Sequence, residues 1–272
     1  MLNSKYSAGN KFIGFIILLL ALTGCQEVQE SRFVVRDAAQ TGLDFSNNLS
    51  ENADWNILHY MYLYNGAGVG AGDFNGDGLT DLYFVSNMEE NRFFLNSGEL
   101  KFTDATEMAG LAGEPGWKTG VSVADVNGDG MLDIYVSYLG SFRSYRGKNL
   151  LYINQGNNDE GVPVFEEQGA DYGLNLVGFS TQAVFFDYDR DGDLDLYQLF
   201  HSVHKNGTYG PRAKKIKESH PLSGDRLFRN DDGFFVDVTA ESGILSSVLG
   251  YGLGIAVSDV NDDGYPDIYV AN

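Results

Sequence analysis

The nine residues Asp125-Val126-Asn127-Gly128-Asp129-Gly130-Met131-Leu132-Asp133 form a pattern that occurs four times in this chain of 272 residues. The other copies start at Asp73, Asp187 and Asp259, and all four fit Asp-x-Asp/Asn-x-Asp-Gly-x-x-Asp. A Gly at position 6 allows a tight turn with positive φ, which would bring the side-chain oxygens of positions 1, 3, 5 and 9 toward one point. The backbone carbonyl oxygen of position 7 can point toward the same place. Hard oxygen donors in this number suit Ca²⁺, so the pattern predicts up to four calcium sites.

The predicted calcium ligands occupy the same positions in every loop. They are Asp73, Asn75, Asp77, Leu79 and Asp81; Asp125, Asn127, Asp129, Met131 and Asp133; Asp187, Asp189, Asp191, Asp193 and Asp195; and Asp259, Asn261, Asp263, Tyr265 and Asp267. An EF-hand needs a bidentate Glu at position 12, where this chain has Phe84, Val136, Gln198 and Val270, so EF-hands are excluded. The alternative is a set of plain Asp/Asn/Gly turns without metal.

The residues on both sides of the loops are typical of β-strands. Gly120-Val121-Ser122-Val123-Ala124 precedes the second loop and Ile134-Tyr135-Val136 follows it. Each loop is therefore predicted to join the two strands of a hairpin. The composition agrees, because 34 Gly, 18 Phe and 16 Tyr stand against only 5 Pro. An all-β fold is expected.

A longer repeat surrounds the loops. Three units open with a Phe that precedes a Gly by eight residues, and a weaker first copy runs from Phe33 to Gly42 with one residue more. Each unit passes through an Asp-rich loop, and the complete units close on an apolar patch ending in Asn. The units are about 33–101, 102–164, 165–234 and 235–272, and they close at Asn96, Asn154 and Asn230. Units of this length are compatible with four-stranded propeller blades that carry loop insertions.

The loops and openings such as Phe102-Thr103-Asp104-Ala105-Thr106 resemble the FG-GAP/VCBS repeat proteins, which include the propellers of integrin α-subunits. The chain more closely resembles the Bacteroidetes-type lipoproteins that join such repeats to a C-terminal ASPIC/UnbV-like region and are related to cartilage acidic protein. The resemblance implies a seven-bladed β-propeller with Ca²⁺ in hairpin loops on one face, and no established catalysis. About three and a half blades fit into this length, so an N-terminal fragment is expected.

The N-terminus predicts export and lipidation. Residues 1–24 have the basic start and apolar core of a signal peptide, and Leu22-Thr23-Gly24-Cys25 resembles a bacterial lipobox with Cys25 as the lipidated residue. Residues 25–32 would then be an acidic tether. A buried N-terminal helix is the alternative. The expected location is the outer membrane or cell surface, with the protein held to the membrane through lipid on Cys25.

The charge balance limits the classes of molecule that the chain is expected to bind. With 38 acidic and 18 basic residues the formal charge is −20, which opposes nucleic-acid binding. The leading hypothesis is a calcium-stabilised binding or scaffold module that recognises a protein or polysaccharide. A glycan-active enzyme and a structural part of a larger envelope complex are the alternatives. An enzyme is disfavoured because Glu89-Glu90 and Glu166-Glu167 are adjacent pairs, which in a strand would point to opposite faces.

One insertion, about 199–224, combines histidines with basic residues. It is interpreted either as a ligand-recognition element or as a solvated surface loop. A zinc site at His201 and His204 is disfavoured by their short spacing. Trp55, Trp117 and His59 are predicted to pack in the core.

Overall fold

The computed structural model describes residues 33–203 and 211–272. The chain divides into two units, Met1–Arg36 and Asp37–Asn272. Residues 33–36 of the first unit have no regular secondary structure. The predicted signal peptide, tether and Cys25, together with His204, lie outside the described residues.

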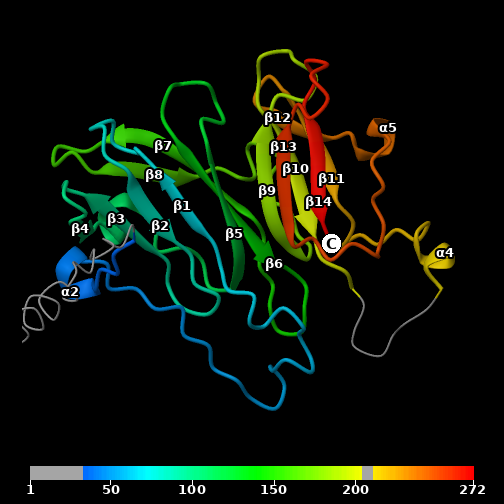
Figure 1. Ribbon diagram of the computed structural model, residues 1–272, viewed down its shortest axis with the longest axis horizontal. Helices are drawn as coiled ribbons and strands as arrows, with labels where there is room; N and C mark the ends of the chain where they lie inside the picture. Colours follow the sequence, from blue (N-terminus) through cyan, green and yellow to red (C-terminus); the bar gives the residue numbers. More distant parts are fainter. Residues whose placement is uncertain (1–32, 204–210) are drawn as a thin grey trace, which may run out of the picture. The chain divides into compact units, whose positions relative to one another are not determined.

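The described residues of the second unit form four antiparallel sheets whose strands stay in chain order (Figure 1). The first sheet contains β1 (Val69–Gly72), β2 (Asp81–Phe84), β3 (Arg92–Asn96) and β4 (Phe102–Asp104). The second contains β5 (Trp117–Ala124), β6 (Asp133–Leu139), β7 (Leu150–Asn157) and β8 (Pro163–Glu167). The third contains β9 (Ser180–Phe186), β10 (Asp195–Phe200), β11 (Arg226–Asp231) and β12 (Phe234–Asp237), and the last contains β13 (Gly254–Ser258) and β14 (Asp267–Ala271). Three four-stranded blades and a two-stranded sheet confirm the predicted all-β, partial β-propeller fold.

The described residues also form four helices of one turn each, of which α2 precedes β1 and the other three lie between strands. They are α2 (Ala38–Thr41), α3 (Thr106–Ala109), α4 (Arg212–Lys215) and α5 (Thr239–Ser242). Helices α3 and α5 follow the outer strands β4 and β12, and each ends at a left-handed Gly. The Phe that opens a repeat in the sequence therefore lies on the outer strand of one sheet, so the sequence repeat is offset from the sheets by one strand.

The first strands of neighbouring sheets lie side by side, β1 next to β5, β5 next to β9 and β9 next to β13. Side-chain hydroxyls join them, since Ser122 Oγ donates to the Ala183 carbonyl at 2.6 Å and Thr119 Oγ to the Ser180 carbonyl at 2.9 Å. Gly120 permits this approach. A Cβ at Gly120 would lie 2.3 Å from the carbonyl oxygen of Thr181.

The apolar core lies between the sheets. One cluster joins Phe93 of the first sheet to Ile134 of the second, another joins Leu151 of the second to Phe228 of the third, and a third joins Leu199 to partly buried residues of the last sheet. Strands β6 and β10 are buried along their whole length. Both of their faces are covered, which explains why their sequences do not alternate between apolar and polar residues.

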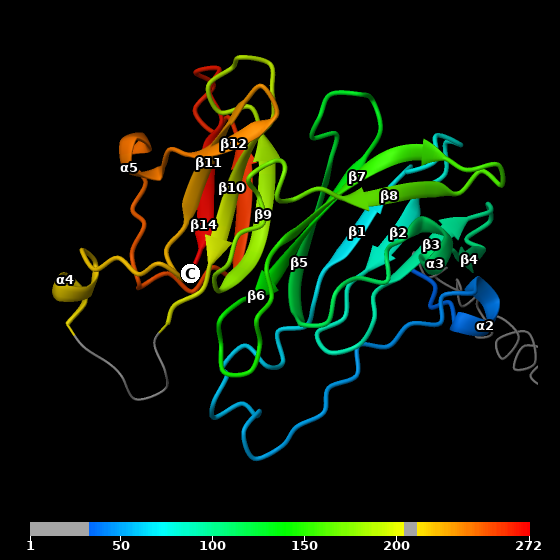
Figure 2. The ribbon, with the colours of Figure 1, turned by 180° about the vertical axis from the view of Figure 1, so that it is seen from behind.

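The segment 43–68 passes along the ends of the sheets that are opposite the Asp-rich loops (Figures 1 and 2). It contributes Trp55 and Tyr60 to an aromatic cluster with Trp117 and Phe179. The rings of Trp55 and Trp117 meet edge to face at 4.8 Å, and both residues are buried, as the sequence predicts. The same prediction for His59 is wrong, because His59 is exposed.

Candidate metal centres

Each Asp-rich loop joins the first and second strands of its sheet. The loops close at the pairs Gly72 with Asp81, Ala124 with Asp133, Phe186 with Asp195, and Ser258 with Asp267. The predicted hairpins are therefore confirmed. All four loops lie at the same end of their sheets, as Figure 1 shows for the last two.

The Asp at position 1 shapes the loop backbone. In the second loop, Asp125 Oδ1 accepts a hydrogen bond from the Asp129 amide at 3.0 Å, and its Oδ2 accepts one from the Gly130 amide at 2.8 Å. The same pair of bonds forms in the other three loops. Gly130 has a φ of 88°, and position 6 is left-handed in every loop, as predicted. Position 4 is also left-handed, including the non-Gly residues Arg190 and Asp262, which the pattern did not indicate.

Positions 3 and 5 are bonded to each other in the three loops that carry Asn at position 3. Asn127 Oδ1 accepts from the Asp129 amide at 3.0 Å, and Asn127 Nδ2 donates to Asp129 Oδ2 at 2.9 Å. Asp129 Oδ1 in turn accepts from the Met131 amide at 2.8 Å. Residues Leu79, Met131, Asp193 and Tyr265 at position 7 are thus tied to position 5 through their amides.

The third loop has the strongest concentration of carboxylates. Asp187, Asp189 and Asp195 each offer an oxygen, and these oxygens lie within 4.8 Å of one another. Among the described residues they form the one group of at least three acidic, His or Cys side chains with this spacing. Ca²⁺ binds oxygens at 2.3–2.6 Å, so ligands across the ion are about 5 Å apart and this set fits it.

The Asp at position 9 braces the loop from inside the sheet. Asp81, Asp133 and Asp195 are fully buried. In each of them, Oδ2 accepts a hydrogen bond from the backbone N–H of loop position 2 at 2.8–3.2 Å. The other oxygen, Oδ1, accepts one from the backbone N–H of an Asn on the third strand at 2.9 Å. Asp267 makes the first of these bonds, with the Val260 amide at 2.9 Å. Position 9 is therefore a structural link as well as a predicted ligand.

The partners on the third strand are Asn96, Asn154 and Asn230, for which the sequence repeat predicts a place at the unit ends but no role. The Asn154 side chain donates to the Leu132 carbonyl at loop position 8, and Asn96 and Asn230 bond the equivalent carbonyls. Their side-chain oxygens accept from the following turn. The recurrence of Asn at each unit end was the available signal.

Burial changes the acidity of the bracing carboxylates. It raises the pKa of Asp133 and of Asp195 to about 6, against the opposing effect of the amide hydrogen bonds, and it raises the pKa of Asp81 as well. An ionised carboxylate is therefore costly in these loops when no cation is near. A bound divalent cation would favour the ionised form.

Other sequence-predicted residues lie apart from the loops. His201 is buried, with Nδ1 donating to the Ser202 carbonyl at 2.9 Å and Nε2 lying 3.3 Å from the Tyr60 hydroxyl. Both ring nitrogens are thus engaged within the protein, which argues against a zinc site there. Glu166 and Glu167 lie in β8, as expected of strand residues. Glu89 and Glu90 lie in the connection between β2 and β3, so the prediction that this pair points to opposite faces of a strand is wrong.

Comparison with known proteins supports the assignment of a repeat to residues of the chain's first two sheets. Residues 73–136 match the FG-GAP-like repeat family. Human cartilage acidic protein 1 is 29% identical over 134 residues, which cover 48% of this chain and 20% of that protein. The Xenopus tropicalis protein of the same name is 23% identical over 212 residues, 76% of this chain and 29% of that protein. The chain thus spans less than a third of these relatives. Residues 73–136 therefore carry the FG-GAP-like repeat that the sequence predicts, and such repeats suggest a β-propeller binding or scaffold module.

No helix in the described parts of the chain has the length and apolar character that crossing a membrane requires.

We expect Asn154→Ala to lower the free energy of unfolding by about 1–3 kcal/mol, because it removes the bonds that a buried amide makes to Phe74, Leu132 and Gly156. Urea denaturation followed by tryptophan fluorescence measures the change. The matched control is Gln155→Ala, an exposed amide on the same strand, which should change stability by less than about 0.5 kcal/mol. Equal effects of the two variants would contradict the bracing role of Asn154.

The raised pKa values predict how pH acts on the metal-free protein. Because the folded-state pKa of Asp133 and Asp195, about 6, lies above the ordinary 3.8, their contribution to stability is lost as pH rises from about 4 through 6. Protons compete with Ca²⁺ for the same carboxylates, so the increase in melting temperature caused by Ca²⁺ should be larger at pH 7 than at pH 5. Calorimetry with Ca²⁺ or chelator at both pH values tests this, and a calcium effect that is the same at both would contradict it.

Proposed function

We propose that this FG-GAP repeat protein is a calcium-stabilised β-propeller module, anchored by lipid to the outer membrane or cell surface, that binds a protein or polysaccharide and has no catalytic role. The observation that carries the proposal is the set of loop oxygens, above all the carboxylates of Asp187, Asp189 and Asp195. Oxygen donors without Cys or His are the ligands that Ca²⁺ prefers.

Electrostatic repulsion supports a structural role for the cation. The third loop carries five Asp residues within nine positions and one basic residue, Arg190. Two like charges at 4 Å repel by about 4 kcal/mol at the effective dielectric of a protein surface. Four Ca²⁺ would change the formal charge of the chain from −20 to −12. A divalent cation in each loop would therefore remove a repulsion that opposes folding.

The binding role is supported by the location of the Asp-rich loops and of the long connections at opposite ends of the sheets. The Asp-rich loops lie at one end of the sheets, and the other end carries the segment 43–68 and the long connections between strands. Long connections on a rigid scaffold are common places for recognition. Membrane anchoring rests on the sequence around Cys25, and the short polar stretch after it would serve as a tether.

Removing calcium should lower the melting temperature. With site dissociation constants of about 10⁻⁴–10⁻³ M, 10 mM Ca²⁺ stabilises the fold by about 1–3 kcal/mol per site. Asp191→Ala should lose a large part of this effect, because Asp191 is a carboxylate at loop position 5. Differential scanning calorimetry of wild type and variant in Ca²⁺, Mg²⁺ and chelator measures it, with Asp159→Ala as an exposed control outside the loops. A melt that responds to neither chelator nor Asp191→Ala would leave the loops as ordinary turns.

Lipidation is tested separately. Radiolabelled palmitate should enter the wild-type precursor in a bacterial host and should be absent from Cys25→Ser, because acylation needs the thiol. Label that persists in the variant would refute the lipid anchor, and protease treatment of intact cells would show on which side of the outer membrane the protein lies.

A further inference from the structure

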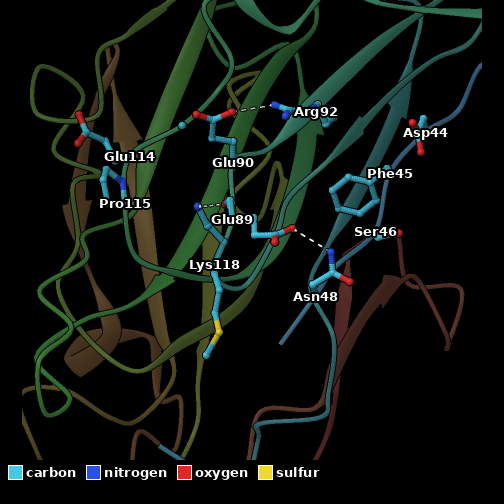
Figure 3. Close-up of a pocket in the computed structure, with 12 residues that line it drawn as sticks. Asp44, Phe45, Ser46, Asn48, Glu89, Glu90, Arg92, Glu114, Pro115 and Lys118 are labelled. Atoms are coloured by element: carbon cyan, nitrogen blue, oxygen red, sulfur yellow. Dashed lines mark hydrogen bonds and ion pairs between the residues drawn. The ribbon is translucent and has the colours of Figure 1, made fainter. Parts of the chain in front are cut away.

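A cleft of about 780 Å³ lies where the connection between β2 and β3 meets the start of β5, at the end of the first two sheets that is opposite the Asp-rich loops. Figure 3 shows the residues that line it. Three segments line it: residues 44–48, the connection between β2 and β3, and the chain from Gly113 to Lys118 at the start of β5. None of the proposed calcium ligands belongs to it. Phe45 forms part of its wall and is held by stacking on Phe84, with ring centroids 5.0 Å apart.

Acidic groups exceed basic groups in the cleft. Its charged residues are Asp44, Glu89, Glu90, Glu114, Arg92 and Lys118. Arg92 pairs with Glu90 at 3.0 Å and also lies 3.7 Å from Asp104, so its charge is already shared. No ion pair joins Asp44, Glu89 or Glu114 to a cation within the described residues. These three side chains are exposed, and they give the opening of the cleft a negative charge.

Lys118 is the unusual member of this group, because only 2% of its surface is exposed. Its Nζ donates to the Glu89 carbonyl at 2.7 Å, the contact drawn in Figure 3. An ammonium group has three donors, and this is the one hydrogen bond recorded for it in the described chain. Burial lowers the pKa of Lys118 to about 8, although Glu90 acts in the opposite direction. The cleft thus combines a nearly buried donor with a carboxylate opening.

A ligand that matches both features needs a cationic group for the opening and an acceptor oxygen for the ammonium. A basic peptide has both, in its side chains and its backbone carbonyls. We propose that the cleft binds a basic peptide segment of a partner protein, with an Arg or Lys side chain among Asp44, Glu89 and Glu114 and a peptide carbonyl accepting from Lys118. This inference rests on the proposed binding function and selects a protein over a polysaccharide as its ligand.

The test measures binding of three probes to the full mature chain in Ca²⁺ buffer by isothermal titration calorimetry. The probes are acetyl-GRGRG-amide, its glutamine counterpart acetyl-GQGQG-amide, and xylohexaose as a neutral oligosaccharide. We expect binding of the arginine peptide alone. The double variant Asp44→Asn/Glu114→Gln should weaken that binding about fivefold to tenfold, since it removes two exposed charge contacts. Glu241→Gln, an exposed charge change on α5, is the control and should leave it unchanged.

Lys118→Met separates specific recognition from general charge attraction. Removing a positive charge would strengthen the binding of any cation if charge alone acted, whereas loss of a donor to the peptide carbonyl weakens it. Weaker binding, with a melting temperature near wild type, supports the proposal. Stronger binding, or an equal loss in the Glu241→Gln control, overturns it. Xylohexaose binding without peptide binding, or binding of none of the probes, would overturn the peptide proposal and leave the proposed binding function to be tested with other ligands.

Discussion

The buried carboxylate at position 9 of the first three Asp-rich loops is the contact on which the blades depend. Asp81, Asp133 and Asp195 each hold the start of the loop with one oxygen and the third strand with the other. A single side chain therefore sets the loop, the hairpin and the position of the next strand together. Because burial raises the pKa of Asp133 and Asp195, the arrangement is costly when these groups are ionised and alone. The proposed calcium would relieve that cost where it arises.

The local part of this arrangement could be predicted from the sequence. Position 6 requires positive φ and the flanking residues favour strands, so the hairpins follow from nine-residue patterns and short-range rules. The contact between Asp133 and Asn154 could not be derived in this way. The two residues are 21 positions apart, and their meeting depends on the register of β6 with β7. The repeat indicated that Asn154 matters but not which atom it bonds.

The environment of some residues depends on distant segments and does not follow from their neighbours in sequence. The aromatic neighbours of His59 predict a place in the core, yet Trp55 and Tyr60 turn toward Trp117 while His59 faces solvent. The sequence predicts Glu89 and Glu90 in a strand, but they lie in a connection and line a cleft with Lys118. The pairing of β2 with β3, which ends at Phe84 and Arg92, places them there. Local composition does not contain that information.

The two ends of the sheets have different chemistry, and the fold explains why they can act separately. The Asp-rich loops connect the first strand to the second, whereas the connections between second and third strands lie at the other end, with the segment 43–68. Between the two ends lie strands such as β6 and β10 that are buried along their full length, and well-packed cores resist deformation. Cation binding would then stabilise the blades without reshaping the cleft beside Lys118. Loop insertions between second and third strands can consequently vary in length from blade to blade while the Asp-rich hairpins keep nine residues each.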